Sequence, residues 1–255
     1  MSAAMTEFAI AADGVRIAYE VVGEGEPVVL VHGFASHRGQ NWRETGWYKT
    51  LTGAGLQVVA LDCRGHGESD KPHDPAAYGE SVMADDIRLV IAAAGLTRAD
   101  VMGYSMGAML TLRLAYDHPE CVTRAILGGV GDMYLSRENS WRAGIADAIG
   151  TDDTSQLSPM QWMFREFAGQ KGKDVEALAA CMRAPRKPLT EDELATIRTP
   201  MLVVAGSRDL ISGPPNALAA ALGNAKYVTV SDRDHMLTVG DKAYKDAAVA
   251  FLQAV

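Results

Sequence analysis

The stretch VMGYSMGAML, residues 101–110, places Ser105 between two glycines, Gly103 and Gly107, directly after apolar residues and directly before a helix-like sequence. A strand that turns sharply into a helix holds such a serine with its Oγ above the edge of a sheet. The strained turn leaves no room for side chains at the flanking positions, which explains the two glycines. The sequence therefore predicts a strand, a tight turn at Ser105, and a helix whose N-terminal amides point toward any anion formed there.

Compact β-branched runs and amphipathic stretches alternate on both sides of this motif. The runs typical of buried parallel strands are residues 27–33, 57–65, 100–105, 123–131, 200–209 and 225–231. One stretch between them repeats its apolar residues at helical spacing: Met83, Ile87, Val90, Ile91 and Ala94. Residues 6–11 and 15–22 flank Asp13-Gly14, which predicts an antiparallel hairpin. The whole pattern predicts an α/β protein with a doubly wound, mostly parallel sheet and an N-terminal hairpin.

One interval interrupts this alternation. Residues 131–198 contain no strand-like run, but they contain a helix start at Ser158-Pro159 and a capping box from Thr190 to Glu193. We therefore expect a core domain formed by residues 1–130 and 199–255, with residues 131–198 inserted as a helical cap.

Composition and charge limit the partners of the chain. Its 255 residues carry a net charge of −8, which argues against a nucleic-acid partner, because phosphate binding depends on Lys and Arg. The N-terminus lacks the pattern of a signal peptide, and no stretch approaches the roughly 20 apolar residues that span a bilayer. We expect a cytoplasmic protein that acts on a small molecule, with no membrane partner. The sequence does not indicate an oligomeric state.

Five motifs in this order make the chain resemble the α/β-hydrolase family over nearly its whole length. They are LVHGF (30–34), LDCRGHGESDKP (61–72), GYSMG (103–107), VVAGSRD (203–209) and DRDHM (232–236). The resemblance implies a nucleophile, an acid and a histidine in that chain order, which are Ser105, Asp209 and His235. It also implies an oxyanion hole formed by the backbone amides of Phe34 and Met106. The family usually has glycine before the histidine, where this chain has Asp234.

The chemistry gives each of these residues a role. Neutral His235 would take the proton of Ser105 during attack and return it to the leaving group. Asp209 would accept the other ring N–H and stabilise the imidazolium, and none of these roles needs a metal or a cofactor. Asp132, after the run at 123–131, is the alternative acid. His32 is interpreted as a packing or hydrogen-bonding residue behind the oxyanion loop.

The substrate class is less sharply defined. Met160, Met163, Phe164 and Phe167 recur at helical spacing in the insertion and are candidates, with Tyr104 and Trp141, for the lining of an apolar pocket. A serine nucleophile favours hydrolysis of a carboxylic ester or lactone through an acyl-enzyme. The alternatives on the same triad are a cofactor-free haloperoxidase or perhydrolase and a C–C bond hydrolase. A ligand-binding pseudo-enzyme on this fold is an alternative of another class.

Overall fold

A single sheet organises the part of the chain that the computed structural model describes, residues 5–136 and 140–254. Residues 1–4 and 255 of the expected core lie outside this part. The sheet has eight strands in the order β1-β2-β4-β3-β5-β6-β7-β8, and every neighbouring pair beyond β4 is parallel. The strands are β1 (Glu7–Ile10), β2 (Arg16–Val22), β3 (Glu26–Val31), β4 (Leu56–Leu61), β5 (Ala99–Tyr104), β6 (Val122–Gly128), β7 (Met201–Gly206) and β8 (Ala225–Val230). The predicted doubly wound, mostly parallel sheet is confirmed.

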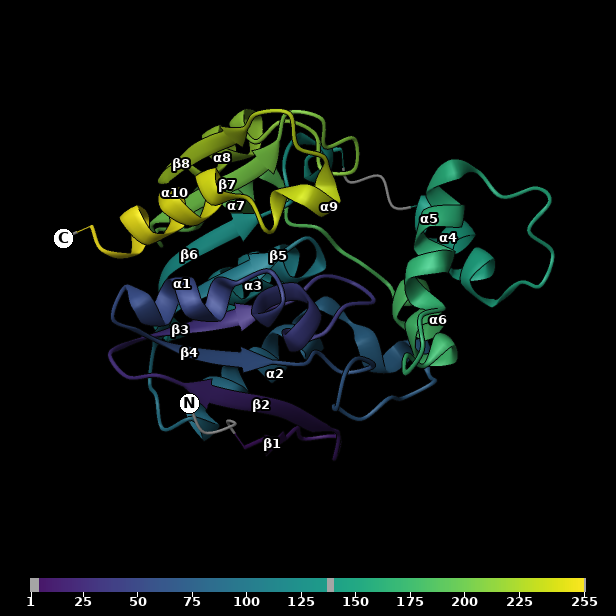
Figure 1. Cartoon of the computed structure of the whole chain (residues 1–255), viewed down its shortest axis with the longest axis horizontal. Helices are drawn as coiled ribbons and strands as arrows, with labels where there is room; N and C mark the ends of the chain where they lie inside the picture. The colour runs from purple at the N-terminus through teal and green to yellow at the C-terminus, as the bar shows by residue number, and fades with distance from the viewer. Residues whose placement is uncertain (1–4, 137–139, 255) are drawn as a thin grey trace.

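Helices cover both faces of this sheet (Figure 1). The α-helices are α1 (Trp47–Gly53), α2 (Glu80–Ala93), α3 (Met106–Asp117), α4 (Trp141–Gly150), α5 (Pro159–Ala168), α6 (Val175–Arg183), α7 (Glu191–Thr196), α8 (Asn216–Leu222), α9 (His235–Thr238) and α10 (Lys242–Leu252). In the described residues, no helix has the length and apolar character that a membrane span requires.

The central strand β3 shows how the two layers of the core are divided. Val28 and Leu30 lie in the cluster that contains the buried side chains of α1 and α10. Val29 and Val31 lie in the cluster that contains those of α2 and α3. Because successive side chains of a strand point to opposite faces, an uninterrupted apolar run is what a strand covered on both sides requires.

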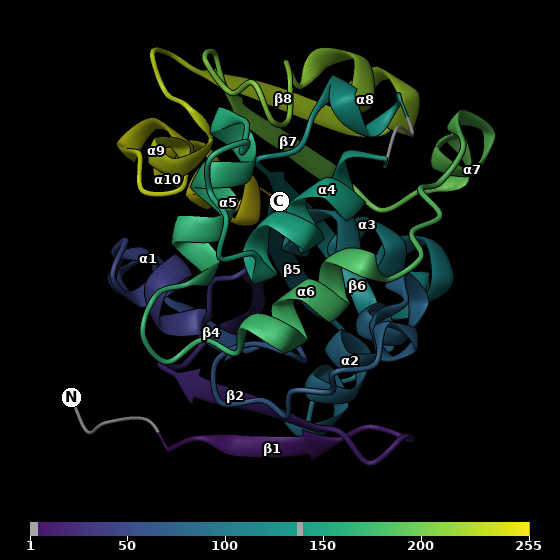
Figure 2. The same cartoon turned by 90° about the vertical axis from the view of Figure 1, so that its right-hand side faces the viewer.

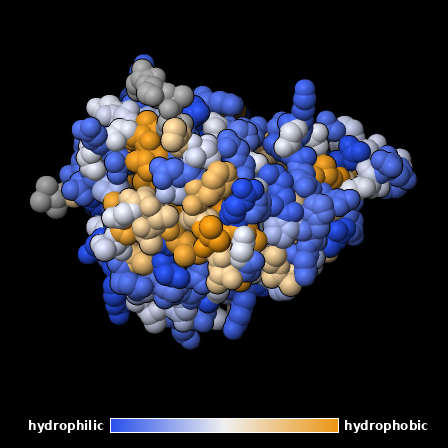
Figure 3. All heavy atoms as spheres, turned by 90° about the horizontal axis from the view of Figure 1, so that it is seen from below, coloured by the Kyte–Doolittle hydropathy of each residue, from blue (hydrophilic) through white to orange (hydrophobic). Residues whose placement is uncertain are grey.

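The N-terminal hairpin closes one edge of the sheet. β1 and β2 pair in antiparallel register, and Gly14 in the connecting turn has a φ of +83°, which glycine adopts without strain. Phe8 and Ile10 on β1 are exposed. Figure 3, which views the molecule from the side of this hairpin, shows apolar surface gathered over the core, whereas the far end of the insertion is mostly polar.

The insertion between β6 and β7 contains α4, α5, α6 and α7 in the described residues. The first three lie together beyond the carboxyl ends of the parallel strands, as Figures 1 and 2 show from two directions. Ser158 and Thr190 form the capping boxes that begin α5 and α7. α7 contacts α3 and α8 and buries Leu194 in the hydrophobic core. The range 131–198 therefore includes one helix that packs on the helices of the core domain.

Candidate active site

Ser105 occupies a strained turn between β5 and α3. Its backbone has φ 53° and ψ −115°, a conformation that non-glycine residues rarely adopt. A Cβ at Gly103 would lie 2.2 Å from the carbonyl oxygen of Gly107, and a Cβ at Gly107 would lie 2.0 Å from that of Val31. Both glycines are therefore required because β5, α3 and the end of β3 meet without space for a methyl group.

Ser105, His235 and Asp209 form an unbroken chain of hydrogen bonds at the carboxyl edge of the sheet. His235 Nε2 lies 2.9 Å from Ser105 Oγ, and His235 Nδ1 lies 2.8 Å from Asp209 Oδ2. The carboxylate accepts from Nδ1–H, which leaves Nε2 as the acceptor for the serine hydroxyl. The three side chains follow β5, β7 and β8, whose carboxyl ends point the same way.

Asp209 is held as a carboxylate by its surroundings. It is buried, and its other oxygen, Oδ1, accepts from the amides of Ile211 at 3.0 Å and Ser212 at 2.9 Å. Burial raises the pKa of Asp209, but the hydrogen bonds and charge of His235, together with Ser212, outweigh it, so the net pKa is lower than usual. The acid therefore remains ionised beside the imidazole.

Asp132, the alternative acid, lies elsewhere. Its Oδ1 accepts from the amide of Ala217 at 3.1 Å, and its own amide donates to the carbonyl of Pro214. These contacts tie the turn after β6 to the start of α8. The structure brings Asp209, and not Asp132, into contact with His235.

Asp234, which stands where the family usually has glycine before the histidine, has a structural role. Its Oδ1 accepts from the amides of Met236 at 3.0 Å and Leu237 at 2.8 Å, so it caps the short helix α9 that begins at His235. The hydroxyl of Tyr104 donates to the backbone carbonyl of His235 at 2.5 Å. The backbone of His235 is thus fixed on two sides.

The loop that carries Phe34 is fixed by buried polar contacts. Gly33 N donates to Asn41 Oδ1 at 3.1 Å, and His32 bridges Gly33 O at 2.8 Å and Cys63 N at 2.9 Å. Burial lowers the pKa of His32 to about 3, so the ring is neutral and can donate from one nitrogen and accept at the other. His32 therefore connects the loop after β3 to the loop after β4.

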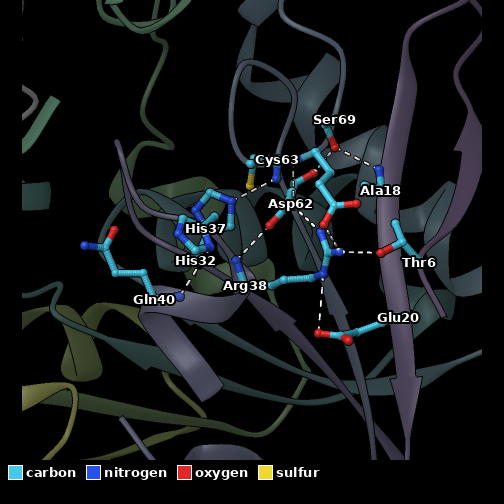
Figure 4. A network of polar contacts seen from close by, with 12 residues as sticks. Thr6, Ala18, Glu20, His32, His37, Arg38, Gln40, Asp62, Cys63 and Ser69 are labelled. Carbon is cyan, nitrogen blue, oxygen red and sulfur yellow. Dashed lines mark hydrogen bonds and ion pairs between the residues drawn. The ribbon is translucent and has the colours of Figure 1, made fainter. Parts of the chain in front are cut away.

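A buried ion network reinforces the same connection (Figure 4). The Arg38 guanidinium contacts Asp62 and also lies 2.9 Å from Glu68 and 3.4 Å from Glu20. The Arg38 amide donates to Asp62 Oδ1 at 2.7 Å. This network is not evident from the sequence, since its members are far apart in the chain. Its signal was the placement of Arg38 a few residues after the run 27–33 and of Asp62, a charged residue, within the buried run 57–65.

Two cavities meet at Ser105. The larger, of about 700 Å³, is bordered by His235, and the smaller, of about 100 Å³, is bordered by Met106. Both are bordered by Phe34, Ser105, Phe164 and Ile211. In the described part of the chain, no three His, Cys, Asp or Glu side chains are grouped as metal ligands would be.

Most of the predicted pocket residues border one of these cavities. Tyr104, Met163, Phe164 and Phe167 border the larger one, and Trp141 and Phe164 the smaller one. In the described part of the chain, Met160 borders neither the larger nor the smaller of these two cavities. It lies in the first turn of α5 with 40% of its surface exposed. Trp162 in the larger cavity and Arg142 in the smaller one were missed, since Trp162 lies outside the apolar repeat and arginine is normally a surface residue.

Residues 26–176 match the family model described as alpha/beta hydrolase fold, and the chain belongs to this family. It is 27% identical over 236 residues to the protein named "Putative carbamate hydrolase RutD" from Klebsiella pneumoniae (strain 342), covering 85% of this chain and 87% of the relative.

Two solved structures have the same fold. A hydrolase from Pseudomonas aeruginosa PA01 is 23% identical with a TM-score of 0.79, covering 99% of this chain and 100% of that chain. The esterase EaEST from Exiguobacterium antarcticum is 22% identical with a TM-score of 0.74, covering 98% and 100%. The family and its relatives support a hydrolase.

Proposed function

We propose that the protein is a serine hydrolase that cleaves carboxylic ester or lactone bonds of small, mainly apolar substrates. The observation that carries this proposal is the hydrogen-bonded chain from Ser105 Oγ through His235 to ionised Asp209, at a point where two cavities meet. An isolated serine hydroxyl is a weak nucleophile, and such a chain is the arrangement that activates it.

The reaction would proceed in two halves. Ser105 Oγ attacks the carbonyl carbon while His235 Nε2 takes the hydroxyl proton, and the proton then passes to the departing alcohol oxygen. Water activated by the same imidazole hydrolyses the acyl-enzyme and releases the acid. Asp209 stabilises the imidazolium in both halves because its carboxylate remains ionised.

The oxyanion would be held by the amides of Phe34 and Met106. Both residues border the smaller cavity beside Ser105, and the Met106 amide lies at the N-terminus of the twelve-residue helix α3. Partial positive charge at a helix N-terminus favours an anion there. One such donor contributes roughly 3 to 4 kcal/mol to the transition state in enzymes where it has been removed.

The walls of the larger cavity support an apolar leaving group. Trp162, Met163, Phe164 and Phe167 of α5 border it together with His235. The relative named as a carbamate hydrolase favours a second candidate, because a carbamate also presents a carbonyl carbon to the serine. Carbamate cleavage would use the same residues in the same roles.

An active-site probe tests the proposal. A fluorophosphonate should label the protein with one equivalent, and peptide mass spectrometry should locate the label on Ser105. A panel of p-nitrophenyl esters of increasing acyl length, and a phenyl carbamate, should then be assayed with and without peroxide. Absence of both labelling and ester turnover would reject a serine hydrolase, and peroxide-dependent turnover alone would favour a perhydrolase.

A further inference from the structure

Arg142 is a buried cation beside the proposed nucleophile. It lies in the first turn of α4, only 7% of its surface is exposed, and it borders the smaller cavity together with Ser105. The residues around it in that cavity are largely apolar, including Met106, Met109 and Met182. Arginine is almost never buried in such surroundings unless it is paired.

In the described residues, Arg142 has no carboxylate partner. Its Nη2 donates to the carbonyl of Cys181 at 3.0 Å, its Nε is buried without an acceptor, and its guanidinium carbon lies 5.9 Å from the centre of the Trp141 ring. Burial, together with the charge of Arg186, lowers the pKa of Arg142 to about 10, and the opposing effects of Cys181 and of the Glu80 carboxylate are smaller, so Arg142 is still charged at neutral pH. One carbonyl and one aromatic ring compensate a buried charge less than a carboxylate does.

The other buried arginines of the described chain show the contrast. Arg38 contacts Asp62, and Arg64 lies 2.6 Å from Asp86. Half-buried Arg186, whose charge disfavours that of Arg142, does not share this contrast, because its Nη2 lies 3.7 Å from Cys181 Sγ and its Nε has no acceptor in the described residues. A buried polar group without a hydrogen-bond partner requires an explanation. One explanation is that the group serves to bind a ligand.

The residues that border the two cavities indicate how a bound ester would be oriented. His235 borders the larger cavity and would protonate the leaving alcohol, so the leaving group belongs there. Met106, whose amide would hold the carbonyl oxygen, borders the smaller cavity. The acyl chain would therefore extend from Ser105 into the smaller cavity, toward Arg142.

We propose that Arg142 binds a carboxylate at the far end of the acyl chain, so that the preferred substrates are monoesters of short dicarboxylic acids. This inference rests on the proposed serine hydrolase function. The volume of about 100 Å³ restricts the chain to a few carbons, and the methionines surround its methylene groups. Hydrolysis consumes one water and yields the alcohol, the dicarboxylate and one proton.

Matched esters test the charge requirement. Monoethyl succinate and monoethyl glutarate each have a neutral counterpart of the same shape in which an amide replaces the free carboxylate. Ester cleavage releases a proton, so a pH-stat measures all four. We expect kcat/KM of the wild-type protein to be at least about tenfold higher for the charged ester of each pair. Equal or lower kcat/KM for the charged esters would overturn the proposal without any variant.

Variants locate the effect. Arg142→Met should raise KM for the charged esters at least about tenfold more than it raises KM for the neutral esters, and Arg142→Lys should recover part of the preference. Arg183→Met is the matched control, because Arg183 lies on neighbouring α6, half exposed and paired with Asp147 at 3.0 Å. A parallel loss on charged and neutral esters in Arg142→Met would reject a specific role for Arg142.

A binding measurement separates this inference from the proposed function. Glutarate should bind to the Ser105→Ala protein in a calorimetric titration, and the additional change Arg142→Met should abolish that binding. If the neutral esters are hydrolysed but charge is not preferred and glutarate does not bind, the Arg142 site is wrong and the serine hydrolase stands. If glutarate binds through Arg142 but no ester is cleaved, the site stands and the proposed function fails.

Discussion

The hydroxyl of Tyr104 donates a hydrogen bond to the backbone carbonyl of His235 at 2.5 Å. Tyr104 directly precedes the proposed nucleophile, so the end of β5 holds both the serine and the backbone of the histidine. The two rings are also in contact, with centroids 5.5 Å apart. Tyr104 is thus a positioning residue as well as part of the cavity wall.

Removing this hydroxyl should weaken catalysis moderately. A single neutral hydrogen bond contributes about 1 kcal/mol, so we expect Tyr104→Phe to lower kcat by about two- to tenfold with KM nearly unchanged. Tyr78→Phe is the matched control, since it also removes a buried hydroxyl that donates to a backbone carbonyl, but to that of Pro72 and not to His235. Steady-state kinetics on one activated ester compares them, and equal effects of the two changes would contradict a positioning role.

The nucleophile gives the largest expected effect. Ser105→Ala should lower kcat for an activated ester by at least about a thousandfold, as loss of a triad member does in other enzymes. Thermal unfolding should change little, because the side chain is only partly buried and alanine removes a single oxygen atom. Retention of a tenth of the wild-type activity would exclude an acyl-enzyme on Ser105.

The two candidate acids can be separated with the same chemical change. Asp209→Asn should cost on the order of 10²- to 10⁴-fold in kcat, because an amide cannot stabilise the imidazolium. Asp132→Asn should stay within about tenfold, since an Asn oxygen can still accept from the Ala217 amide. Circular dichroism should confirm that both variants fold. The reverse ranking would assign the acid to Asp132.

Two buried histidines should make the fold sensitive to acid. Burial lowers the pKa of His32 and of His66 to about 3 from the ordinary value of 6.5. Between about pH 3 and pH 6.5 the unfolded chain therefore binds protons on these two rings, and the native protein does not. Stability is therefore fully present above about pH 6.5 and falls as the pH decreases toward 3, by at most about 1.4 kcal/mol per pH unit for each ring.

Urea unfolding at pH 7.5, 6.5, 5.5 and 4.5 measures this dependence. His66→Gln removes one of the two rings, so its unfolding free energy should vary less steeply with pH than that of the wild type. His73→Gln is the control, because His73 is half exposed and its pKa is raised by Asp174. Its removal should therefore not make the pH dependence of the unfolding free energy less steep. Identical slopes in His66→Gln and the wild type would show that His66 does not carry this linkage.

The sequence predicted the features that depend on local chain geometry. Gly103 indicated the turn at Ser105 for a local reason, because a Cβ there would collide with Gly107 four residues later, whereas Gly107 is required by the close approach of Val31 on β3. The hairpin at Asp13-Gly14 was also predicted for a local reason. The doubly wound, mostly parallel character of the sheet followed from the alternation of buried strands and helices.

Features that depend on tertiary placement were not accessible in this way. Asp132 and Asp209 both follow a buried strand, so the local pattern did not separate them; the family resemblance named Asp209, whose Oδ2 lies 2.8 Å from His235 Nδ1 in the structure. Met160 fits the apolar repeat of α5, yet the cavity does not reach the first turn of that helix. Arg142 was missed because the burial of a charge is a property of the surrounding helices and not of the residue.

The insertion leaves the sheet after β6 and returns before β7, and its helices α4 and α5 border the cavities while Ser105, Asp209 and His235 remain on the sheet side. The residues proposed for catalysis and the part of the cavity walls that α4 and α5 supply are therefore encoded in separate stretches of the gene. Recombination that exchanges this one stretch for its counterpart from another member of the family would give a chimera with an inherited catalytic chain and a new choice of substrate. Laboratory evolution of this protein can accordingly concentrate its diversity in a single continuous block of codons.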